Sequence, residues 1–424
     1  MNVLFLSLLD FNTFDERNIY SDLLREFIKN GHKICCVSPV EKRFNQKTQL
    51  LEFGESCILK LRIGNTQKVN LIEKGISTLR IEPLFVRGVK KYFSHIKFDL
   101  ILYATPPVTF AKVIRYVKKR DGAQSYLMLK DIFPQNSIDL GMLTKTGIKG
   151  VIYNYFRKKE KELYSISDRI GCMSQANVDY ILKHNPELVA EKVEICPNCI
   201  EVRNEILTEE ERLLMRDKYG VPRDKKVFVY GGNLGKPQDV PFIVKCLRAC
   251  SDLTNAYFVI AGSGTDRHIL EEYLKKENPS HVRLFEQMPK DEYDAFIGCC
   301  DVGLIFLDHR FTIPNFPSRL LSYMQAGLPV LACTDPNTDV GKVIVDGEFG
   351  WWCESDDEKV FFDYIRKIIV SNSAKYSYDA HLRTYNSYDV ERVYTTCFMP
   401  FLEGIYNEKQ KDFNYKPQSF EPSK

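Results

Sequence analysis

The chain has 424 residues and a formal net charge of +3, with 44% hydrophobic and 27% charged residues. This length exceeds what one hydrophobic core usually supports, so it predicts two domains, and the composition is that of a globular protein rather than a disordered one. No apolar run approaches the roughly 20 residues that cross a bilayer, and Met1–Leu9 is typical of a first strand rather than a signal peptide.

The first half of the chain alternates strand-like and helix-like segments. Runs that are apolar on both sides predict strands of a parallel sheet, covered by helices on both faces. The expected strands are Val3–Leu8, Lys33–Ser38, Asp99–Tyr103, Gln124–Leu129, Arg169–Met173 and Val193–Cys196. The expected helices are Arg17–Asn30, Thr109–Lys119 and Gly147–Ile166.

The same alternation restarts after Pro197-Asn198, which places a domain boundary near residue 200. The second set of expected strands is Lys226–Tyr230, Ala256–Ala261, Val282–Phe285, Val302–Phe306 and Pro329–Ala332, with helices at Thr208–Tyr219 and Ser318–Ala326. The sequence therefore predicts an α/β protein of two doubly wound sheets, residues 1–200 and 201–387, with ligands bound in the cleft between them. A helix over 388–408 is expected to pack back on the first domain, and 409–424 to form a polar tail without regular structure.

Two segments of the second domain predict a site for an anion. The strand ending at Tyr230 runs into Gly231-Gly-Asn-Leu-Gly-Lys236, where glycines expose backbone N–H groups and the lysine adds a charge. Ser318 and Arg319 open a later helix with a hydroxyl and a guanidinium. Because helix starts in a parallel sheet face the carboxyl ends of the strands, both segments are expected on one rim of the cleft. Either could alternatively be an ordinary turn or a solvated arginine, and Gly262-Ser-Gly264 is interpreted as a packing turn.

An ordered set of motifs resembles the retaining glycosyltransferases of the GT-B architecture, family 4, and within it the bacterial capsule and O-antigen subgroup that includes N-acetylfucosaminyl transferases. The motifs are Arg25–His32, Tyr103–Pro107, Leu129–Asn136, Pro197-Asn198, Tyr230–Gly235, Ala261–Gly264, Pro317–Met324 and Ala326–Val330. Each motif alone is weakly specific, but the set spans about residues 2–407 in the same order. The resemblance implies the GT-B fold, in which two Rossmann-like doubly wound domains face each other across a cleft.

The resemblance also implies a nucleotide-sugar donor, expected to be a UDP-sugar whose sugar could be an N-acetylated amino sugar. The residues expected around its diphosphate are Gly232, Asn233, Lys236, Ser318 and Arg319, and those around its base and ribose are Glu286, Gln287 and Ser322. The family usually has a lysine at the position of Arg319, so the charge is kept. No metal, other cofactor or protein nucleophile is implied, because cations and a helix dipole would stabilise the departing diphosphate.

In the first domain, Asp131 is the candidate catalytic residue, as a polar contact to the sugar or acceptor, with Gln135 and Asn136 beside it on the acceptor side. The alternative for Asp131 is a turn or helix-cap residue. The family's paired glutamates fall at Pro314 and Ser322, so the carboxylate that would take the ribose hydroxyls is missing. Its loss could cost on the order of 1–3 kcal/mol of donor binding.

That departure leaves open a catalytically weak homologue that acts as a partner subunit of a glycan assembly complex. A nucleotide-sugar epimerase on the same fold is a third alternative, but no convincing set of carboxylates and a histidine converges on the cleft. No nucleic-acid-reading module is recognisable, so nucleic acid is not an expected partner. The thirteen cysteines suit reduced, buried thiols, and the lone C-x-x-C at Cys196–Cys199 is not expected to bind zinc or act in redox chemistry.

The first half of the chain is basic. Residues 1–200 carry 31 Lys and Arg against 21 Asp and Glu, whereas 201–424 carry 28 against 35. This fits an anionic membrane surface, and the resemblance implies a lipid-linked glycan acceptor in capsule or O-antigen biosynthesis. We expect a cytoplasmic protein held at the inner face of the plasma membrane by Arg87–Lys91, Arg115–Arg120 and Arg157–Lys161 with their interleaved aromatics. Alternatively, the aromatics are core residues and the lysines are simply solvated.

Overall fold

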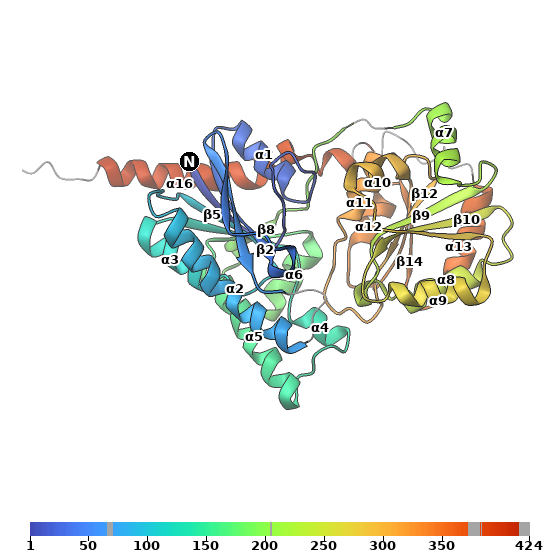
Figure 1. The fold of residues 1–424 in the computed structure, drawn as a ribbon, viewed down its shortest axis with the longest axis horizontal. Helices are drawn as coiled ribbons and strands as arrows, with labels where there is room; N and C mark the ends of the chain where they lie inside the picture. The colour runs from blue at the N-terminus through green and yellow to red at the C-terminus, as the bar shows by residue number, and fades with distance from the viewer. Residues whose placement is uncertain (66–70, 204–205, 372–381, 383, 415–424) are drawn as a thin grey trace, which may run out of the picture.

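The computed structural model describes residues 1–65, 71–203, 206–371, 382 and 384–414. They form two α/β domains that lie side by side, each built on its own sheet with helices on both faces (Figure 1). The prediction of two doubly wound sheets is confirmed.

The first sheet has eight strands in the order β3-β4-β2-β1-β5-β6-β7-β8. Neighbouring strands are parallel except β3 and β4, which form an antiparallel hairpin at one edge. The strands are β1 (Asn2–Leu6), β2 (Lys33–Glu41), β3 (Gln49–Phe53), β4 (Ser56–Ile63), β5 (Leu100–Thr105), β6 (Gln124–Leu129), β7 (Arg169–Cys172) and β8 (Val193–Ile195). The hairpin was not predicted, because its strands carry charged residues and lack the uniformly apolar character of the central ones.

Helices cover both faces of this sheet. They are α1 (Ser21–Lys29), α2 (Leu71–Tyr92), α3 (Ala111–Asp121), α4 (Gln135–Asp139), α5 (Gly147–Ile166) and α6 (Gln175–His184), with short 3-10 turns η1 (Lys42–Phe44) and η2 (Ala190–Lys192). Apolar side chains of α2, α3 and α5 form one core with one face of the sheet. The opposite face packs against α1 and the C-terminal helices.

The second sheet has six parallel strands in the order β11-β10-β9-β12-β13-β14. They are β9 (Lys226–Asn233), β10 (Ala256–Ser263), β11 (Val282–Phe285), β12 (Val302–Phe306), β13 (Val330–Thr334) and β14 (Gly350–Glu354), of which β14 was not predicted. The helices are α7 (Glu209–Tyr219), η3 (Lys236–Gln238), α8 (Val240–Ala249), α9 (Arg267–Glu277), α10 (Lys290–Ile297), α11 (Arg319–Gln325), α12 (Val340–Asp346) and α13 (Glu358–Val370). Residues of α7, α10, α11 and α12 pack on one face of the sheet, and those of α8, α9 and α13 on the other.

The chain returns to the first domain at its C-terminal end, through α15 (Val390–Val393), the π-helical turn η5 (Tyr394–Phe398) and α16 (Met399–Asn414). Phe398 is fully buried there and packs on Tyr126, with ring centroids 4.7 Å apart. The helix does not end near 408 as expected but continues to Asn414, and Lys409 forms an ion pair with Asp99 of the first domain. The rest of the expected tail, 415–424, lies outside the described residues.

Apolar and polar contacts join the two domains on one side of the space between them. Leu307, Phe311 and Ile313 of the second domain belong to the apolar core of the first. The carboxylate of Asp139, at the end of α4, accepts hydrogen bonds from the backbone N–H and the hydroxyl of Thr312, at 2.8 and 2.9 Å. These contacts fix how the carboxyl ends of the two sheets face each other.

Candidate functional site

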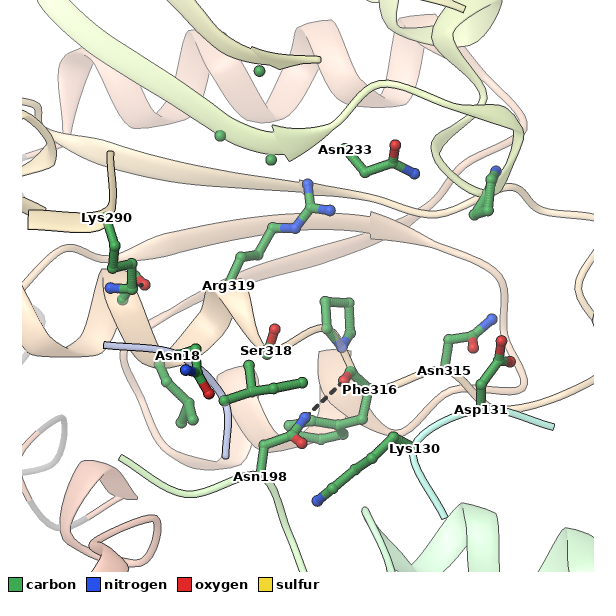
Figure 2. A pocket seen from close by; sticks show the side chains of 18 of the residues that line it. Asn18, Lys130, Asp131, Asn198, Asn233, Lys290, Asn315, Phe316, Ser318 and Arg319 are labelled. Carbon is green, nitrogen blue, oxygen red and sulfur yellow. Dashed lines mark hydrogen bonds between the residues drawn. The ribbon is translucent and has the colours of Figure 1, made fainter. Parts of the chain in front are cut away.

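A cavity of about 860 Å³ lies between the two domains. Its first-domain wall contains Arg17–Tyr20, which follow β1, and Lys130-Asp131, which follow β6. Its second-domain wall comes from the ends of β9 and β10, the segment after β11 and the start of α11. Strand ends and helix starts of both sheets therefore meet at one place, which is where open α/β sheets bind ligands (Figure 2).

Gly231 and Gly232, at the end of β9, let the backbone approach the side chains of Tyr293 and Arg319 closely. Gly232 has a φ of +126°, which residues with side chains rarely adopt. A Cβ atom there would lie 3.5 Å from the guanidinium carbon of Arg319. A Cβ on Gly231 would collide with the hydroxyl of Tyr293, at 1.9 Å. Backbone conformation at Gly232 and the lack of space beside Tyr293 at Gly231 therefore both favour glycine, and the strand end lies next to the Arg319 guanidinium.

Arg319 lines the cavity, and one N–H donor group of its guanidinium forms no hydrogen bond with the described residues. Its guanidinium lies over the ring of Tyr230, 4.4 Å from the centroid. Its Nη1 atom is buried and has no hydrogen-bond partner among the described residues. A buried donor of a charged group without a partner is costly, so this atom indicates an anionic ligand between α11 and the end of β9. Figure 2 shows the guanidinium in the middle of the cavity.

The helix that carries Arg319 is fixed to the sheet by Tyr323. The Tyr323 hydroxyl accepts a bond from the N–H of Gly231 at 3.3 Å. The same hydroxyl donates a hydrogen bond to the carbonyl oxygen of Leu304 at 3.0 Å. This fully buried phenol sets the distance between α11 and β9, and therefore the width of the anion site.

The structure brings eight of the predicted site residues to the cavity wall. They are Asp131, Asn136, Gly232, Asn233, Gln287, Ser318, Arg319 and Ser322. The amide of Asn233 donates to Gln238 at 2.8 Å. The side-chain oxygen of Gln287 accepts from the hydroxyl of Ser263 at 2.6 Å, which joins the ends of β10 and β11.

Three predicted residues do not line the cavity. Lys236 is exposed in η3 and does not line the cavity, so of the two cations expected on one rim Arg319 alone lies there. Glu286 is exposed and accepts a bond from Arg267 at 2.7 Å. The amide of Gln135 donates to Asp139 at 2.8 Å, within α4.

Asp131 lies on the wall opposite the second domain, at the end of β6. Burial raises its pKa to about 6, and the nearby charge of Glu160 acts in the same direction. The Ile132 N–H and the Asn136 amide, which donates at 2.8 Å, oppose this rise in pKa. A carboxylate with a pKa close to neutral can accept a proton or a hydrogen bond from a sugar hydroxyl.

Several cavity residues were not predicted. They are Arg17, Asn18, Lys130, Asn198, Lys290 and Asn315. Asn198 lies in the Pro197-Asn198 motif and donates to the Phe316 carbonyl oxygen at 3.4 Å, so the motif itself was a signal (Figure 2). Lys130 directly precedes Asp131 and could have been found in the same way. Arg17 and Lys290 carry no comparable signal, because each is fixed by partners outside its own motif.

One group of described residues has the composition of a metal site. The ligand atoms of Asp239, Asp308 and His309 lie within 4.8 Å of one another. The guanidinium of Arg310 already binds the Asp308 carboxylate, with Nε 2.9 and 3.1 Å from its two oxygens. The positive charge that this carboxylate needs is therefore supplied by the protein itself.

Many of the cations in the basic segments expected at a membrane form ion pairs with carboxylates of the first domain. Arg157 binds Glu160 at 2.6 Å, Lys159 binds Glu162 at 3.0 Å, and Phe93 is a core residue. Phe93 agrees with the alternative interpretation, in which the aromatic side chains are core residues. The paired cations bind carboxylates of the same domain. No helix among the described residues is both long enough and apolar enough to cross a bilayer.

An exposed apolar surface lies elsewhere, on the first turns of α5. Ile148, Val151, Ile152 and Tyr155 share one face of the helix by their spacing, and Ile148 and Val151 are 85% and 70% exposed. We call these four residues the α5 ridge. Lys145, Lys149 and Lys158 flank it and form no ion pair with the described acidic residues.

The second domain is similar to a known family. The family model described as glycosyl transferases group 1 matches residues 211–384, which include the second-domain wall of the cavity. "Probable glycosyltransferase WbjE" of Pseudomonas aeruginosa is 22% identical over 349 residues, 80% of this chain and 84% of that protein. WcaI of Escherichia coli K12, a glycosyl transferase named for colanic acid biosynthesis, is 21% identical over 248 residues, 58% and 60% of the two chains.

Solved structures share the fold. The Anabaena protein Alr3699/HepE in complex with UDP and glucose superposes with a TM-score of 0.67 at 14% identity, covering 98% of this chain and 99% of that one. Its complex with UDP-glucose gives a TM-score of 0.66 at 12% identity, covering 97% and 100%. The expected GT-B architecture is thereby confirmed.

Proposed function

We propose that this chain, a glycosyltransferase of the GT-B architecture, transfers a sugar from a UDP-sugar to a lipid-linked glycan during assembly of a bacterial surface polysaccharide. The observation that carries the proposal is the Nη1 atom of Arg319, which is buried next to Gly232 and has no hydrogen-bond partner in the part of the chain that the structure describes. The colanic acid name of WcaI supports a polysaccharide product, and the UDP complexes of Alr3699/HepE support a uridine nucleotide. The motif resemblance supports transfer with retention and a capsule or O-antigen product.

In this proposal Arg319 binds the diphosphate of the donor. When the bond between the sugar and the diphosphate breaks, negative charge grows on the leaving group. A preorganised guanidinium stabilises that charge without having to reorganise. The cation is part of the chain, so transfer should proceed without added divalent metal and should survive EDTA.

Asp131 and Asn136 line the cavity from the first domain, opposite the wall to which we assign the donor, so we assign them to the acceptor side. Their hydrogen bond at 2.8 Å fixes the carboxylate orientation. We assign Asp131 a polar contact to a hydroxyl of the transferred sugar or of the acceptor. A carboxylate whose pKa is raised to about 6 by burial is ionised at pH 7.5 and can accept that hydrogen bond.

The α5 ridge supports a lipid-linked acceptor and attachment to the inner face of the plasma membrane. Exposed apolar side chains flanked by lysines suit the interface of an anionic bilayer. The ridge is also close in the chain to the acceptor wall. The N–H groups of Met142 and Leu143, just before α5, both donate to the Ser137 carbonyl oxygen of α4 at 2.9 Å. We propose that a glycan whose lipid is bound at the ridge reaches the cavity wall that contains Asn136 and Asp131.

The catalytically weak partner subunit remains the second candidate, because Ser322 stands where the resemblance expects a glutamate. Two measurements separate the candidates. A thermal-shift panel of UDP, GDP, CDP, TDP and UDP-sugars should show selective stabilisation by the uridine compounds. Release of UDP should then depend on a lipid-diphosphate-linked glycan added to the protein. Stabilisation by UDP without release would favour the partner subunit, and no stabilisation by any nucleotide would contradict both.

A further inference from the structure

Lys130 is a cation of the first-domain wall that has no acidic partner among the described residues. It directly follows β6 and lines the cavity. Its ammonium nitrogen lies 3.5 Å from the carbonyl oxygen of Pro197, at the limit of a hydrogen bond. Figure 2 shows the Lys130 side chain extending toward Asn198 and the carboxylate of Asp131 pointing the other way. The ammonium is therefore open to the cavity and is not neutralised by the adjacent carboxylate.

The other cations of the cavity wall already have a partner or an assigned ligand. Arg17 and Lys290 form ion pairs with acidic residues of α10. Arg319 belongs to the second-domain wall, where we assign it the diphosphate of the donor. Asp22, an acidic residue that lines the cavity, is bound by Arg25. A positive charge is therefore left on the acceptor side without a counter-ion in the part of the chain that the structure describes.

The surroundings of this ammonium contain few groups that could stabilise a charge. Burial raises the pKa of the Cys172 and Cys199 thiols to about 12, and the nearby charge of Lys130 opposes that rise. The ammonium therefore lies close to uncharged thiols, which are weak hydrogen-bond acceptors. A cation with such neighbours and one distant carbonyl oxygen gains more from an anionic ligand than a cation on an open surface does.

We propose that Lys130 binds a negatively charged group of the acceptor, so that the enzyme takes an acidic acceptor. This inference rests on the proposed function, which assigns the first-domain wall to the acceptor. The ligand chemistry is an oxyanion that accepts hydrogen bonds from an ammonium group. Its source is the carboxylate of an acidic sugar or a phosphate of the lipid carrier. The direction of the side chain favours the carboxylate, because the lipid is proposed to enter past Asn136, whereas Lys130 extends toward Asn198 (Figure 2).

The test is thermal unfolding of the full chain with small acceptor analogues, in saturating UDP so that Arg319 is occupied. The probes are methyl glucoside, methyl glucuronide and glucose 1-phosphate, compared at equal ionic strength. The first is neutral, the second adds a carboxylate, and the third adds a phosphate. At least one anionic probe should stabilise the protein at concentrations about tenfold lower than the neutral one, which is the value of one hydrogen bond to a charged group. The probe that does so identifies the source of the charge.

Variants of Lys130 separate its charge from its packing. Lys130→Met should abolish the difference between the anionic and neutral probes and leave the affinity for UDP within about twofold. Lys130→Arg keeps the positive charge and should keep the difference, and Lys130→Gln repeats the test if methionine disturbs folding. Lys183→Met is the matched control, because Lys183 is an exposed lysine of α6 outside the cavity, and it should behave as the unmodified protein.

Three results would overturn this inference and leave the proposed function standing. The first is the same response of the unmodified protein to all three probes, or a response to none. The second is a difference that persists in both Lys130→Met and Lys130→Gln. The third is a tenfold loss of UDP affinity in these variants, which would assign the ammonium to the donor. If UDP does not stabilise the unmodified protein at all, the proposed function itself fails.

Discussion

Gly262 and Gly232 lie against each other where β10 and β9 end. A Cβ atom on Gly262 would lie 1.9 Å from the carbonyl oxygen of Gly232. This contact brings the two strand ends together and sets the wall of the cavity above Arg319. The sequence Gly262-Ser-Gly264, interpreted above as a packing turn, therefore does pack closely on β9. Gly262 and Ser263 also line the cavity.

The contact predicts that Gly262→Ala destabilises the protein and weakens nucleotide binding. The added methyl group forces the strand ends apart, with an expected loss of about 1–3 kcal/mol in the free energy of unfolding. Gly404→Ala is the control: this exposed helical glycine has nothing within 4 Å of its Cβ position, so alanine should stabilise by about 0.5–1 kcal/mol. Urea unfolding of both variants gives the comparison, and equal stability of the two would refute the packing role.

The pKa of Asp131 makes stability depend on pH. Burial raises this pKa to about 6 from an ordinary value of 3.8, so the folded state holds the proton more tightly than the unfolded state does. The favourable contribution is complete below about pH 4 and is lost as the pH rises through 6. Asp131→Asn avoids this loss, so its stability advantage should grow between pH 4 and 7, to no more than about 3 kcal/mol.

The same substitution should lower sugar transfer, because the uncharged amide oxygen is a weaker hydrogen-bond acceptor than a carboxylate and cannot take up a proton. Thermal unfolding at pH 4.5 and pH 8, together with UDP release at pH 8, separates the two effects. An advantage that is the same at both pH values would show that another property of the side chain is responsible.

The α5 ridge predicts attachment to anionic vesicles. Val151→Glu places a charge in the middle of the ridge and should abolish flotation with phosphatidylglycerol vesicles, while UDP affinity stays within about twofold. Val370→Glu is the control, because Val370 is 85% exposed but lies at the end of α13 in the second domain. If the ridge variant still floats with the vesicles, or if both variants fail to float, the α5 ridge is not the surface that binds the membrane.

The central strands of both sheets could be predicted because burial on both faces leaves uninterrupted apolar runs, as in β6 and β12. The strand β4 could not, because Lys60 interrupts its pattern. That lysine is fully buried, and it is tolerated because Asp10, fifty residues away, forms an ion pair with it. A charge neutralised by a distant residue has no local signature.

The same limit applies to the site. Arg319 could be predicted because it opens a helix next to recognisable motifs. Lys290 could not be predicted, because its position at the cavity wall depends on an ion pair with Asp294, which in turn binds Arg17 of the other domain. Lys236 is the reverse case: it follows a glycine-rich turn, but its side chain is exposed in η3 and does not line the cavity.

The central claim is that Arg319 holds the diphosphate of the donor. Calorimetric titration with UDP tests it on the unmodified chain, on Arg319→Met and on Arg223→Met, an exposed arginine of the same domain that pairs with Asp217. We predict that UDP binds Arg319→Met at least about tenfold more weakly and Arg223→Met with unchanged affinity. An affinity for UDP that is the same in all three proteins would contradict the account.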